Sequence, residues 1–266
     1  MNENLTLIPQ TNFEDRVKSI HDDGYVYFPN AMTPDEVTEL KTAMDKMIPI
    51  EASFNRNHTP DKDGFLQKHI NNAFNHNPIF IQYLDRPDVI DLIEAIHGED
   101  CHIIGMTAWI TGPGRPDQKL HCDWLPIELP EDIVADPHVQ VPIFISTAHY
   151  YLNDMYEKLG PTKFIPGSHK SGRLPNGDTE WKGQTEKSVI CKAGDLVVFR
   201  SEVWHRGTSN HSNENRYLLQ VHYAKRMIAQ KFPPYLNKFK FDPDIINKCT
   251  PRQRRLLGDH TQSAYD

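Results

Sequence analysis

The chain has 266 residues and a formal net charge of −7 at neutral pH. This length allows one large domain or two small ones with a substantial buried core. The acidic balance argues against nucleic acid as a partner, and no apolar stretch is long enough to cross a bilayer. The N-terminus, Met1-Asn2-Glu3-Asn4, also lacks the character of a signal peptide.

The cysteines stand far apart and form no C-x-x-C pair. Their spacing predicts free thiols in a reducing compartment, not a disulfide framework or a zinc site. We therefore expect a soluble cytoplasmic protein without a membrane partner. The four cysteines are Cys101, Cys122, Cys191 and Cys249.

The first hundred residues have the patterns of helices with one strand. Residues 12–21 form a short amphipathic segment, and residues 25–28 are aromatic and β-branched, as in a strand. Thr33-Pro34-Asp35-Glu36 is a capping box with proline at the first helical position, which predicts a helix over residues 34–47. A further helix is expected to begin at Pro87 and to end at Gly98.

Several polar residues carry no clear chemical signal. Residues 65–72 lack periodicity; they could line a pocket, but a surface loop is the commoner structure for such a stretch. Lys68 and Lys119 are candidate pocket residues, with a surface position as the commoner alternative. Nine histidines have no partner at ligand spacing and are treated as ordinary residues: His58, His69, His76, His97, His102, His138, His211, His222 and His260.

Strand patterns dominate from Cys101 onward. Short strands separated by Gly, Pro and Asn turns predict a sandwich or a barrel, not an alternating α/β fold. The loop at residues 125–140 is acidic and long; loops of this length are often lids, and a surface excursion is the alternative. Strands are expected at residues 102–111, 119–124, 141–152, 162–165, 188–192, 196–200 and 216–224.

His121-Cys122-Asp123 is the first motif that suggests chemistry. It follows a Gly/Pro-rich turn and is expected to open a strand, in which residues i and i+2 point to the same face. With a second histidine, such a pair makes the 2-His-1-carboxylate site of non-heme Fe(II). His21-Asp22-Asp23 has the same spacing, but it ends a predicted helix, where these positions do not face each other. The alternative for His121 is an ordinary strand histidine.

Two further candidates lie near the end of the strand-rich region. His205 stands at a strand end before a Gly/Ser/Asn turn, and Arg216 opens an apolar strand eleven residues later. A buried arginine needs an anionic partner, and its planar guanidinium suits a carboxylate. The alternative is a structural ion pair between Arg216 and an acid such as Glu214.

These residues and the block Gly160-Pro161-Thr162-Lys163-Phe164-Ile165-Pro166-Gly167-Ser168-His169 make the sequence resemble the phytanoyl-CoA dioxygenase (PhyH-like) family of Fe(II)/2-oxoglutarate-dependent oxygenases. The resemblance extends from Asp23-Gly24-Tyr25 to residues 251–258. It implies an α+β fold with a mainly β core, a double-stranded β-helix (jelly roll, cupin-like) braced by N-terminal helices. We expect one domain over residues 1–266, with helical support at about 12–98, the jelly roll at about 101–226 and a C-terminal tail at 227–266.

The resemblance also implies roles for individual residues. His121, Asp123 and His205 would bind the iron. Arg216, helped by the hydroxyl of Thr162, would bind the distal carboxylate of 2-oxoglutarate. His149 stands where family members often have a tryptophan that contacts this co-substrate; here the imidazole could instead contact the substrate.

The implied reaction is hydroxylation of an unactivated C–H bond, with Fe(II), 2-oxoglutarate and O2 required, succinate and CO2 released, and ascorbate stimulatory. Asp123 favours hydroxylation, because related halogenases lack this carboxylate; desaturation, epoxidation and ring closure stay open. Bulky side chains could shield the site or simply form core: Trp109, Trp124, Tyr151 and Trp204.

The expected substrate is a small molecule, a natural product or an amino-acid-like metabolite of secondary metabolism. The acidic loop at residues 125–140 favours a neutral or cationic compound over a CoA thioester. Three alternatives stay open: an oxygenase acting on a CoA thioester, a non-catalytic jelly roll that binds a metal or ligand, and a zinc hydrolase that needs no 2-oxoglutarate.

Overall fold

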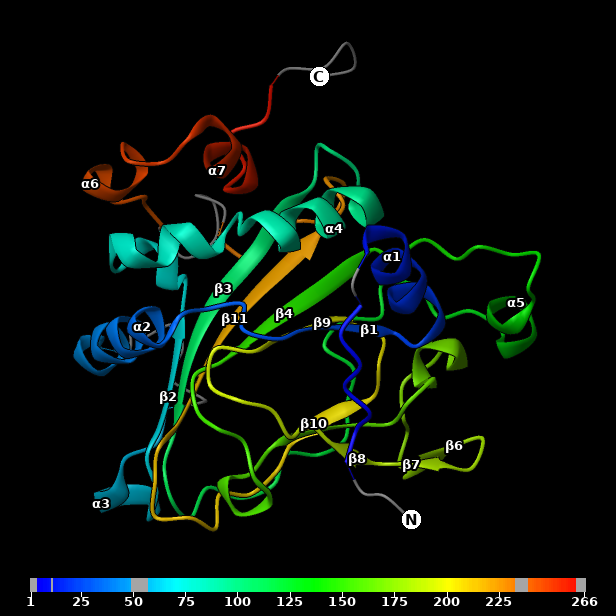
Figure 1. Ribbon diagram of the computed structural model, residues 1–266, viewed down its shortest axis with the longest axis horizontal. Helices are drawn as coiled ribbons and strands as arrows, with labels where there is room; N and C mark the ends of the chain where they lie inside the picture. Colours follow the sequence, from blue (N-terminus) through cyan, green and yellow to red (C-terminus); the bar gives the residue numbers. More distant parts are fainter. Residues whose placement is uncertain (1–3, 11, 49–56, 233–238, 262–266) are drawn as a thin grey trace.

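The computed structural model describes residues 4–10, 12–48, 57–232 and 239–261, and its centre is formed by two antiparallel β-sheets (Figure 1). The larger sheet has the strand order β1-β9-β4-β11-β3-β2, and the smaller has the order β10-β5-β8. This arrangement agrees with the predicted jelly-roll core. The larger sheet consists of β1 (Tyr25–Phe28), β9 (Leu196–Arg200), β4 (Ile145–Tyr151), β11 (Arg216–Ala224), β3 (His102–Thr111) and β2 (Gln67–Asn71).

The smaller sheet consists of β10 (His205–Gly207), β5 (Thr162–Phe164) and β8 (Lys187–Ser188), and β6 (Glu180–Trp181) pairs with β7 (Gln184–Thr185). Helices α1 (Phe13–Asp22), α2 (Pro34–Lys46) and α4 (Pro87–His97) precede β3 in the chain. The shorter helices are α3 (Pro60–Asp63), α5 (Glu131–Ala135), α6 (Pro243–Ile246) and α7 (Pro251–Leu256). The 3-10 helices are η2 (Ala73–Asn75), η3 (Pro78–Tyr83), η4 (Glu157–Leu159) and η5 (Ser168–Ser171).

Helix α2 shows how local sequence sets these boundaries. The Thr33 side chain accepts a hydrogen bond from the Glu36 backbone N–H, and the Glu36 carboxylate accepts one from the Thr33 N–H. This predicted capping box satisfies two backbone donors that the helix itself cannot bond. The apolar face of α2, including Leu40, belongs to the main hydrophobic core, as does Leu92 of α4.

The central strand β11 separates that core from the space between the sheets. Its odd-numbered residues from Tyr217 to Tyr223 belong to the core under the helices, whereas Leu218, Gln220 and His222 line a cavity on the opposite face. This division follows from the period of two in a β-strand. Leu219 is completely buried, and burying such a side chain contributes about 1.5–3 kcal/mol.

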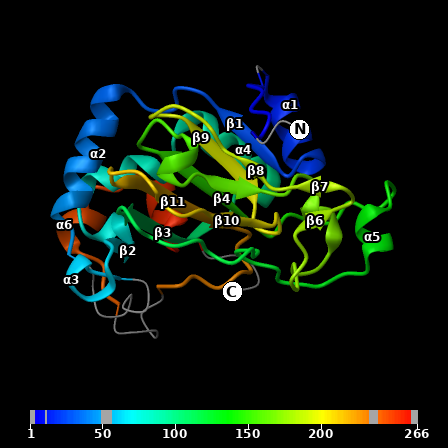
Figure 2. The same ribbon diagram turned by 90° about the horizontal axis from the view of Figure 1, so that it is seen from below.

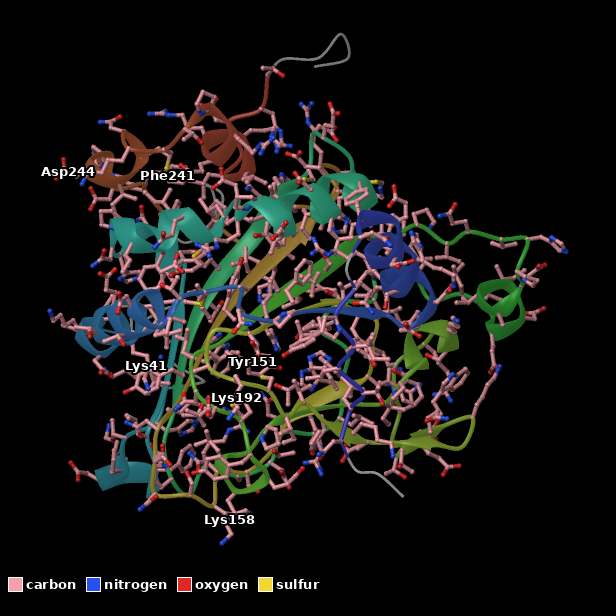
Figure 3. All side chains as sticks on the ribbon, in the orientation of Figure 1. Lys41, Tyr151, Lys158, Lys192, Phe241 and Asp244 are labelled. Atoms are coloured by element: carbon pink, nitrogen blue, oxygen red, sulfur yellow. The ribbon has the colours of Figure 1, made fainter. Side chains whose placement is uncertain are left out.

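The segments outside the jelly roll take part in the same packing. Strands β1 and β2, both from the first hundred residues, extend the larger sheet at its two edges. Phe241, near the C-terminal helices, packs against the main core, whereas Tyr151 lies between the sheets (Figure 3). Helix α5 lies at the periphery in both ribbon views (Figures 1 and 2). None of the helices in the described part of the chain is long and apolar enough to cross a membrane.

Three sequence-based expectations were wrong. Of residues 188–192, which were expected to form a strand, only Ser188 lies in one, at the end of β8. Residues 65–72 are not a surface loop, because Gln67–Asn71 form β2 and pair with β3. Residues 119–124 do not form a strand: His121 makes an isolated bridge with His205, and the backbone N–H of Asp123 turns instead to the carbonyl of Ser201. The pairing partner of β2 is remote in sequence, so local periodicity could not reveal it.

Candidate active site

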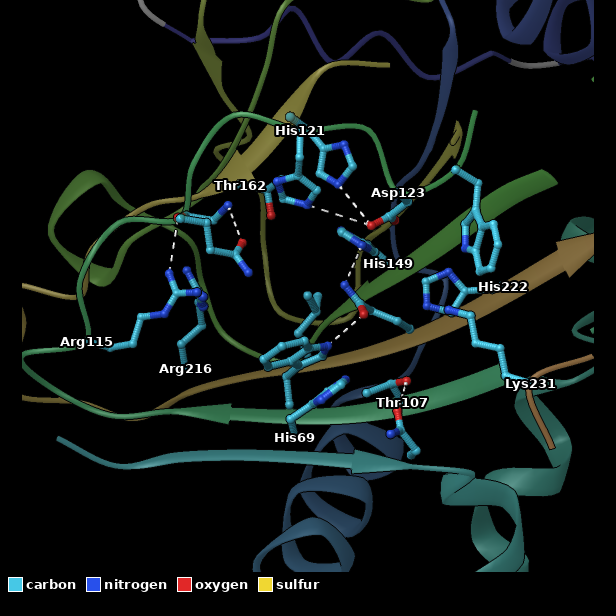
Figure 4. Close-up of a pocket in the computed structure, with 18 residues that line it drawn as sticks. His69, Thr107, Arg115, His121, Asp123, His149, Thr162, Arg216, His222 and Lys231 are labelled. Carbon is cyan, nitrogen blue, oxygen red and sulfur yellow. Dashed lines mark hydrogen bonds and ion pairs between the residues drawn. The ribbon is translucent and has the colours of Figure 1, made fainter. Parts of the chain in front are cut away.

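Three side chains converge between the sheets to form a group that could hold a metal ion (Figure 4). Nε2 of His205 lies 3.6 Å from Oδ1 of Asp123, and Nε2 of His121 lies 3.8 Å from the same oxygen. Their potential ligand atoms all lie within 4.8 Å of one another. No second group of this kind occurs among the described residues, so His21-Asp22-Asp23 does not form one.

The backbone brings the two histidines together and fixes their proton positions. His121 and His205 exchange two backbone hydrogen bonds, of 3.0 and 2.8 Å. Nδ1 of His121 lies 2.7 Å from the Lys119 carbonyl, and Nδ1 of His205 lies 2.8 Å from the Val203 carbonyl. A carbonyl only accepts, so each Nδ1 carries a proton and each neutral ring keeps its Nε2 lone pair for a cation.

The electrostatics of this group favour positive charge between the ligand atoms. Burial alone would raise the pKa of Asp123, but His205, His222 and His121 together hold it well below its usual range. Burial would lower the pKa of His205, but the carboxylate of Asp123 raises it. A site that favours a proton at this point also suits a metal cation.

Asp123 is oriented by a second set of contacts. While its Oδ1 faces the histidines, its Oδ2 accepts a hydrogen bond of 3.4 Å from the hydroxyl of Thr147. The same hydroxyl lies 3.0 Å from Nδ1 of His222. Cys122 points away, with its thiol 3.3 Å from the Glu202 carbonyl. His121 and Asp123 thus share a face, as the sequence predicted.

The site opens into a cavity of about 470 Å³ (Figure 4). Its lining comes from strands β2, β3, β4, β5, β10 and β11, from residues 115–124 and from Lys231. Arg216 and Thr162 both line it, and so does His149. The structure therefore places the six predicted site residues around a single space.

The guanidinium of Arg216 is incompletely hydrogen-bonded. Its Nη1 is buried and has no hydrogen-bond partner among the described residues. Glu214 does not form an ion pair with it in the described structure; its carboxylate accepts a hydrogen bond of 2.8 Å from the Tyr156 hydroxyl. Burial and the nearby Arg115 lower the pKa of Arg216 to about 10. A buried cation without a counter-ion is costly, so the cavity suits an anionic ligand here.

Arg115 is a second cation at the Arg216 end of the cavity, and the sequence analysis did not identify it as a site residue. Its Nε donates to the Gln67 side chain at 3.1 Å, and its Nη1 donates to the Gly207 carbonyl at 3.1 Å. Burial lowers its pKa to about 10. The available signal was that Arg115 lies in the Gly/Pro-rich turn just before His121. The direction of its side chain, however, depends on partners that are distant in the sequence.

His149 lies in a buried chain of hydrogen bonds. The indole Nε1 of Trp109 donates to the Gln220 oxygen at 2.6 Å, and the Gln220 nitrogen lies 2.8 Å from Nε2 of His149. Nδ1 of His149 is buried without a partner among the described residues. Burial holds the pKa of His149 well below its usual range, so the ring is neutral.

Two histidines that the sequence analysis treated as ordinary line the cavity. His69 stacks on Trp109 with ring centroids 4.0 Å apart, and His222 is on β11. The alternation of β11 was the signal for His222, which shares the face of Gln220. Lys68 does not line the cavity but donates to the backbone carbonyls of Asp45 and Met47.

The bulky shielding candidates separate into two groups. Trp109 and Trp124 line the cavity. Trp204 is buried elsewhere and donates its indole N–H to the Arg173 carbonyl at 3.0 Å, and Tyr151 packs in the core between the sheets. The other candidate lysine, Lys119, is exposed and does not line the cavity.

Solved structures show where this fold occurs. HygX from Streptomyces hygroscopicus, with nickel and 2-oxoglutarate bound, superposes with a TM-score of 0.64 at 14% identity over 87% of this chain and 96% of that one. The epimerase SnoN, in complex with Fe3+, alpha ketoglutarate and nogalamycin RO, gives 0.63 at 18% identity over 86% and 92%. These similarities show a shared fold.

Sequence relatives extend over most of the chain. The dioxygenase ALT11 of Alternaria alternata is 26% identical over 270 residues, which cover 96% of this chain and 84% of that protein. The dioxygenase FUM3 of Gibberella moniliformis is 24% identical, with 91% and 80% covered. The family described as phytanoyl-CoA dioxygenase (PhyH) matches residues 20–217. This chain therefore belongs to the phytanoyl-CoA dioxygenase family, as its motifs predicted, and is a dioxygenase.

Proposed function

We propose that this protein is an Fe(II)/2-oxoglutarate-dependent hydroxylase of a small molecule, with succinate and CO2 as co-products. His121, Asp123 and His205 hold the iron. Arg216 and Thr162 bind the distal carboxylate of 2-oxoglutarate. The observation that carries the proposal is a buried guanidinium nitrogen, Nη1 of Arg216, which has no hydrogen-bond partner among the described residues and lies in the same cavity as the His/Asp/His group.

The residues fit both groups on chemical grounds. Two imidazole Nε2 atoms and one carboxylate oxygen are the donor set that suits ferrous iron with open coordination positions. The planar guanidinium of Arg216 suits a carboxylate, which would satisfy its orphaned Nη1. Bound iron supplies the activation of O2, with 2-oxoglutarate as the reductant consumed.

The protein supplies orientation and a controlled environment. Arg216 and Thr162 would hold the distal carboxylate of the keto acid, and the Thr147 hydroxyl donates to the Asp123 oxygen that does not face the histidines. His149 is neutral and offers a buried Nδ1 to the co-substrate. Trp109 and Leu218 line the wall and limit the access of water.

Relatives support a natural product as the substrate. One curated relative is named the Fe(II)/2-oxoglutarate-dependent dioxygenase nvfF of Aspergillus novofumigatus, at 22% identity. HygX has also been solved with hygromycin B bound, and SnoN with nogalamycin RO. We extend the same class, a small secondary metabolite, to this chain. The four free cysteines support a reducing compartment, the cytoplasm, as its location.

The test is spectroscopic. Anaerobic addition of Fe(II) and then 2-oxoglutarate to the purified protein should produce the visible charge-transfer band of a keto acid chelated to ferrous iron. Asp123→Ala should lose iron, and Arg216→Gln should bind iron but require far more 2-oxoglutarate. Arg254→Gln, outside the cavity, is the control and should behave as the native protein does.

A native protein that binds iron without producing this band would overturn the proposal. The zinc hydrolase or the non-catalytic metal-binding protein would then be the better explanation of the site. Neither alternative has a use for the orphaned guanidinium of Arg216, which is why the hydroxylase is preferred.

A further inference from the structure

The charges along the cavity are unevenly distributed. Arg115 and Arg216 lie at one end, Lys231 lies at the other, and the His/Asp/His group lies between them (Figure 4). Among the described residues that line the cavity, Asp123 is the one carboxylate. The lining therefore presents cationic side chains at both ends, with the carboxylate of Asp123 between them.

The end with Arg115 and Arg216 is explained by the proposed function. The distal carboxylate of 2-oxoglutarate would pair with Arg216 there. The Lys231 end of the cavity takes no part in binding 2-oxoglutarate. Its side chains therefore indicate which kind of substrate the cavity accepts.

Lys231 is built into that opposite end. Its backbone N–H donates to the Ile104 carbonyl at 2.9 Å, and the neighbouring Gln230 side chain donates to the Ile103 carbonyl at 3.0 Å. These bonds fix the segment beside β3. The Lys231 side chain crosses Gly105, where an added Cβ would lie 3.7 Å from its Cδ.

The ammonium group of Lys231 lies against an aromatic wall. Its Nζ is 4.8 Å from the ring centroid of Trp124, directly after the metal motif, and both residues line the cavity. A cation over an indole face gains about 0.5–1 kcal/mol at exposed sites. This contact directs the charge toward the cavity, with a planar apolar surface beside it.

The acidic loop at residues 125–140 does not contribute charge to the Lys231 end of the cavity. None of residues 125–140 lines the cavity, and Glu131 of α5 pairs with Lys182 at 3.0 Å. Helix α5 contacts η5 and lies at the edge of the molecule (Figures 1 and 2). The expectation of a cationic substrate, which relied on this loop, therefore has no support in the cavity lining.

We propose that Lys231 and Trp124 form a substrate subsite for a small carboxylic acid. The carboxylate pairs with the Lys231 ammonium, the adjacent carbon skeleton lies on the Trp124 ring, and the carbon to be oxidised reaches toward the metal group. A single ammonium matches the one negative charge of a carboxylate, whereas a phosphate monoester carries close to two. This inference rests on the proposed function, which assigns the other end to 2-oxoglutarate.

Equilibrium dialysis against three probes tests the subsite. The probes are 3-phenylpropanoate, its primary amide and 3-phenylpropylamine, which share a skeleton and differ in charge. The protein is loaded anaerobically with Fe(II) and saturating 2-oxoglutarate, so that the Arg216 end is filled and no turnover occurs. The acid should bind about fivefold or more tightly than the amide, and the amine should bind most weakly.

Variants assign this preference to one side chain. Lys231→Gln should bind acid and amide equally, and Lys231→Glu should favour the amine. The matched control is Lys182→Gln: Lys182 lies 5.2 Å from the Trp181 ring in a similar cation–aromatic pair but does not line the cavity. It should keep the native preference.

Two results would overturn the subsite. One is equal binding of acid and amide by the native protein, and the other is an acid preference that survives Lys231→Gln. Either result, obtained while the charge-transfer band with 2-oxoglutarate is present, rejects the subsite alone. Absence of that band in the native protein would instead reject the proposed function.

Discussion

The side-chain nitrogen of Gln220 lies 2.8 Å from Nε2 of His149, and this contact determines which imidazole nitrogen carries the proton. The indole N–H of Trp109 can only donate, so the Gln220 atom 2.6 Å from it must be the oxygen. The Gln220 nitrogen then donates to Nε2 of His149, which must accept. The neutral ring therefore carries its proton on Nδ1, the buried atom without a described partner.

Gln220→Glu should reverse this tautomer. A carboxylate accepts from both neighbours, so it would accept the Trp109 N–H and require an N–H at Nε2 of His149. Loss of the Nδ1 proton should weaken 2-oxoglutarate binding about three- to tenfold, the value of one hydrogen bond. Nitrogen-15 NMR of the His149 ring reports the tautomer directly, and titration reports the affinity.

The control for added charge is Gln118→Glu. Gln118 also lines the cavity, and its oxygen accepts from the Gly207 N–H at 2.8 Å, a bond that glutamate can keep. This variant should leave the His149 tautomer unchanged. If His149 in Gln220→Glu still carries its proton on Nδ1, the chain from Trp109 does not control the ring.

Thr147→Val should weaken iron binding by about 10- to 100-fold, as loss of a contact behind a metal ligand typically does. The variant keeps the shape of the side chain but removes the hydroxyl that bonds Oδ2 of Asp123 at 3.4 Å. Thr107→Val is the matched control, because Thr107 lines the cavity beside the site but donates its hydroxyl hydrogen bond to Asn71 at 3.3 Å and not to Asp123. Equal iron dissociation constants for the two variants would exclude a role for Thr147 in orienting Asp123.

Local sequence predicted the elements whose signals are local. The capping box at Thr33 and the stop at Gly98 marked helix ends correctly. The prediction that the His121 and Asp123 side chains share a face also holds, although residues 119–124 do not form the expected strand. The alternation of β11 would also have revealed Gln220 and His222 as neighbours of Arg216, had it been applied to that strand.

Arg115 shows what sequence could not provide. Its guanidinium is held by Gln67, which is 48 positions earlier and lies on a strand that pairs with β3. That pairing is a long-range event governed by packing, so no periodicity near Arg115 indicates it. The same reasoning applies to His69, which reaches the cavity because β2 joins the edge of the sheet.

The free energy of unfolding should decrease in mild acid because His97 is buried as a neutral ring. Its Nδ1 lies 3.1 Å from the Ile143 carbonyl and its Nε2 lies 2.8 Å from the Ser146 hydroxyl, and burial lowers its pKa from 6.5 to about 3. Between these values the unfolded chain binds the extra proton and the folded chain does not. The free energy of unfolding should therefore decrease as pH falls below 6.5, by about 1.4 kcal/mol per pH unit for this group.

Urea unfolding at pH 7.5 and pH 5.5 measures this effect. His97→Gln should be less stable at pH 7.5 by about 1–3 kcal/mol, because the buried partners lose a fitted side chain, but its stability should depend less on pH. His138→Gln, on the exposed loop, should change neither quantity. An unchanged pH dependence in His97→Gln would assign the acid sensitivity to other groups, of which buried His169, with a pKa of about 3, is the first to test.

Gly160→Ala should disturb the co-substrate end through the backbone. Gly160 has φ +81°, and an added Cβ would lie 2.6 Å from the carbonyl oxygens of Thr208 and Ser209. The backbone N–H of Thr208 also bonds the Pro161 carbonyl at 3.1 Å, so the turn cannot yield without moving Thr162. We expect a loss of about 3 kcal/mol in stability, together with weaker 2-oxoglutarate binding.

Gly177→Ala separates backbone strain from the steric clash. Gly177 has φ +98°, but nothing lies within 4 Å of an added Cβ. Its substitution should cost about 1–2 kcal/mol from the left-handed conformation alone and should leave 2-oxoglutarate binding intact. Thermal unfolding and 2-oxoglutarate titration of the two variants give the comparison. If both lose the same stability and neither loses affinity, close packing at Gly160 does not position Thr162, and the hydroxyl must be held by the pairing of β5 with β10.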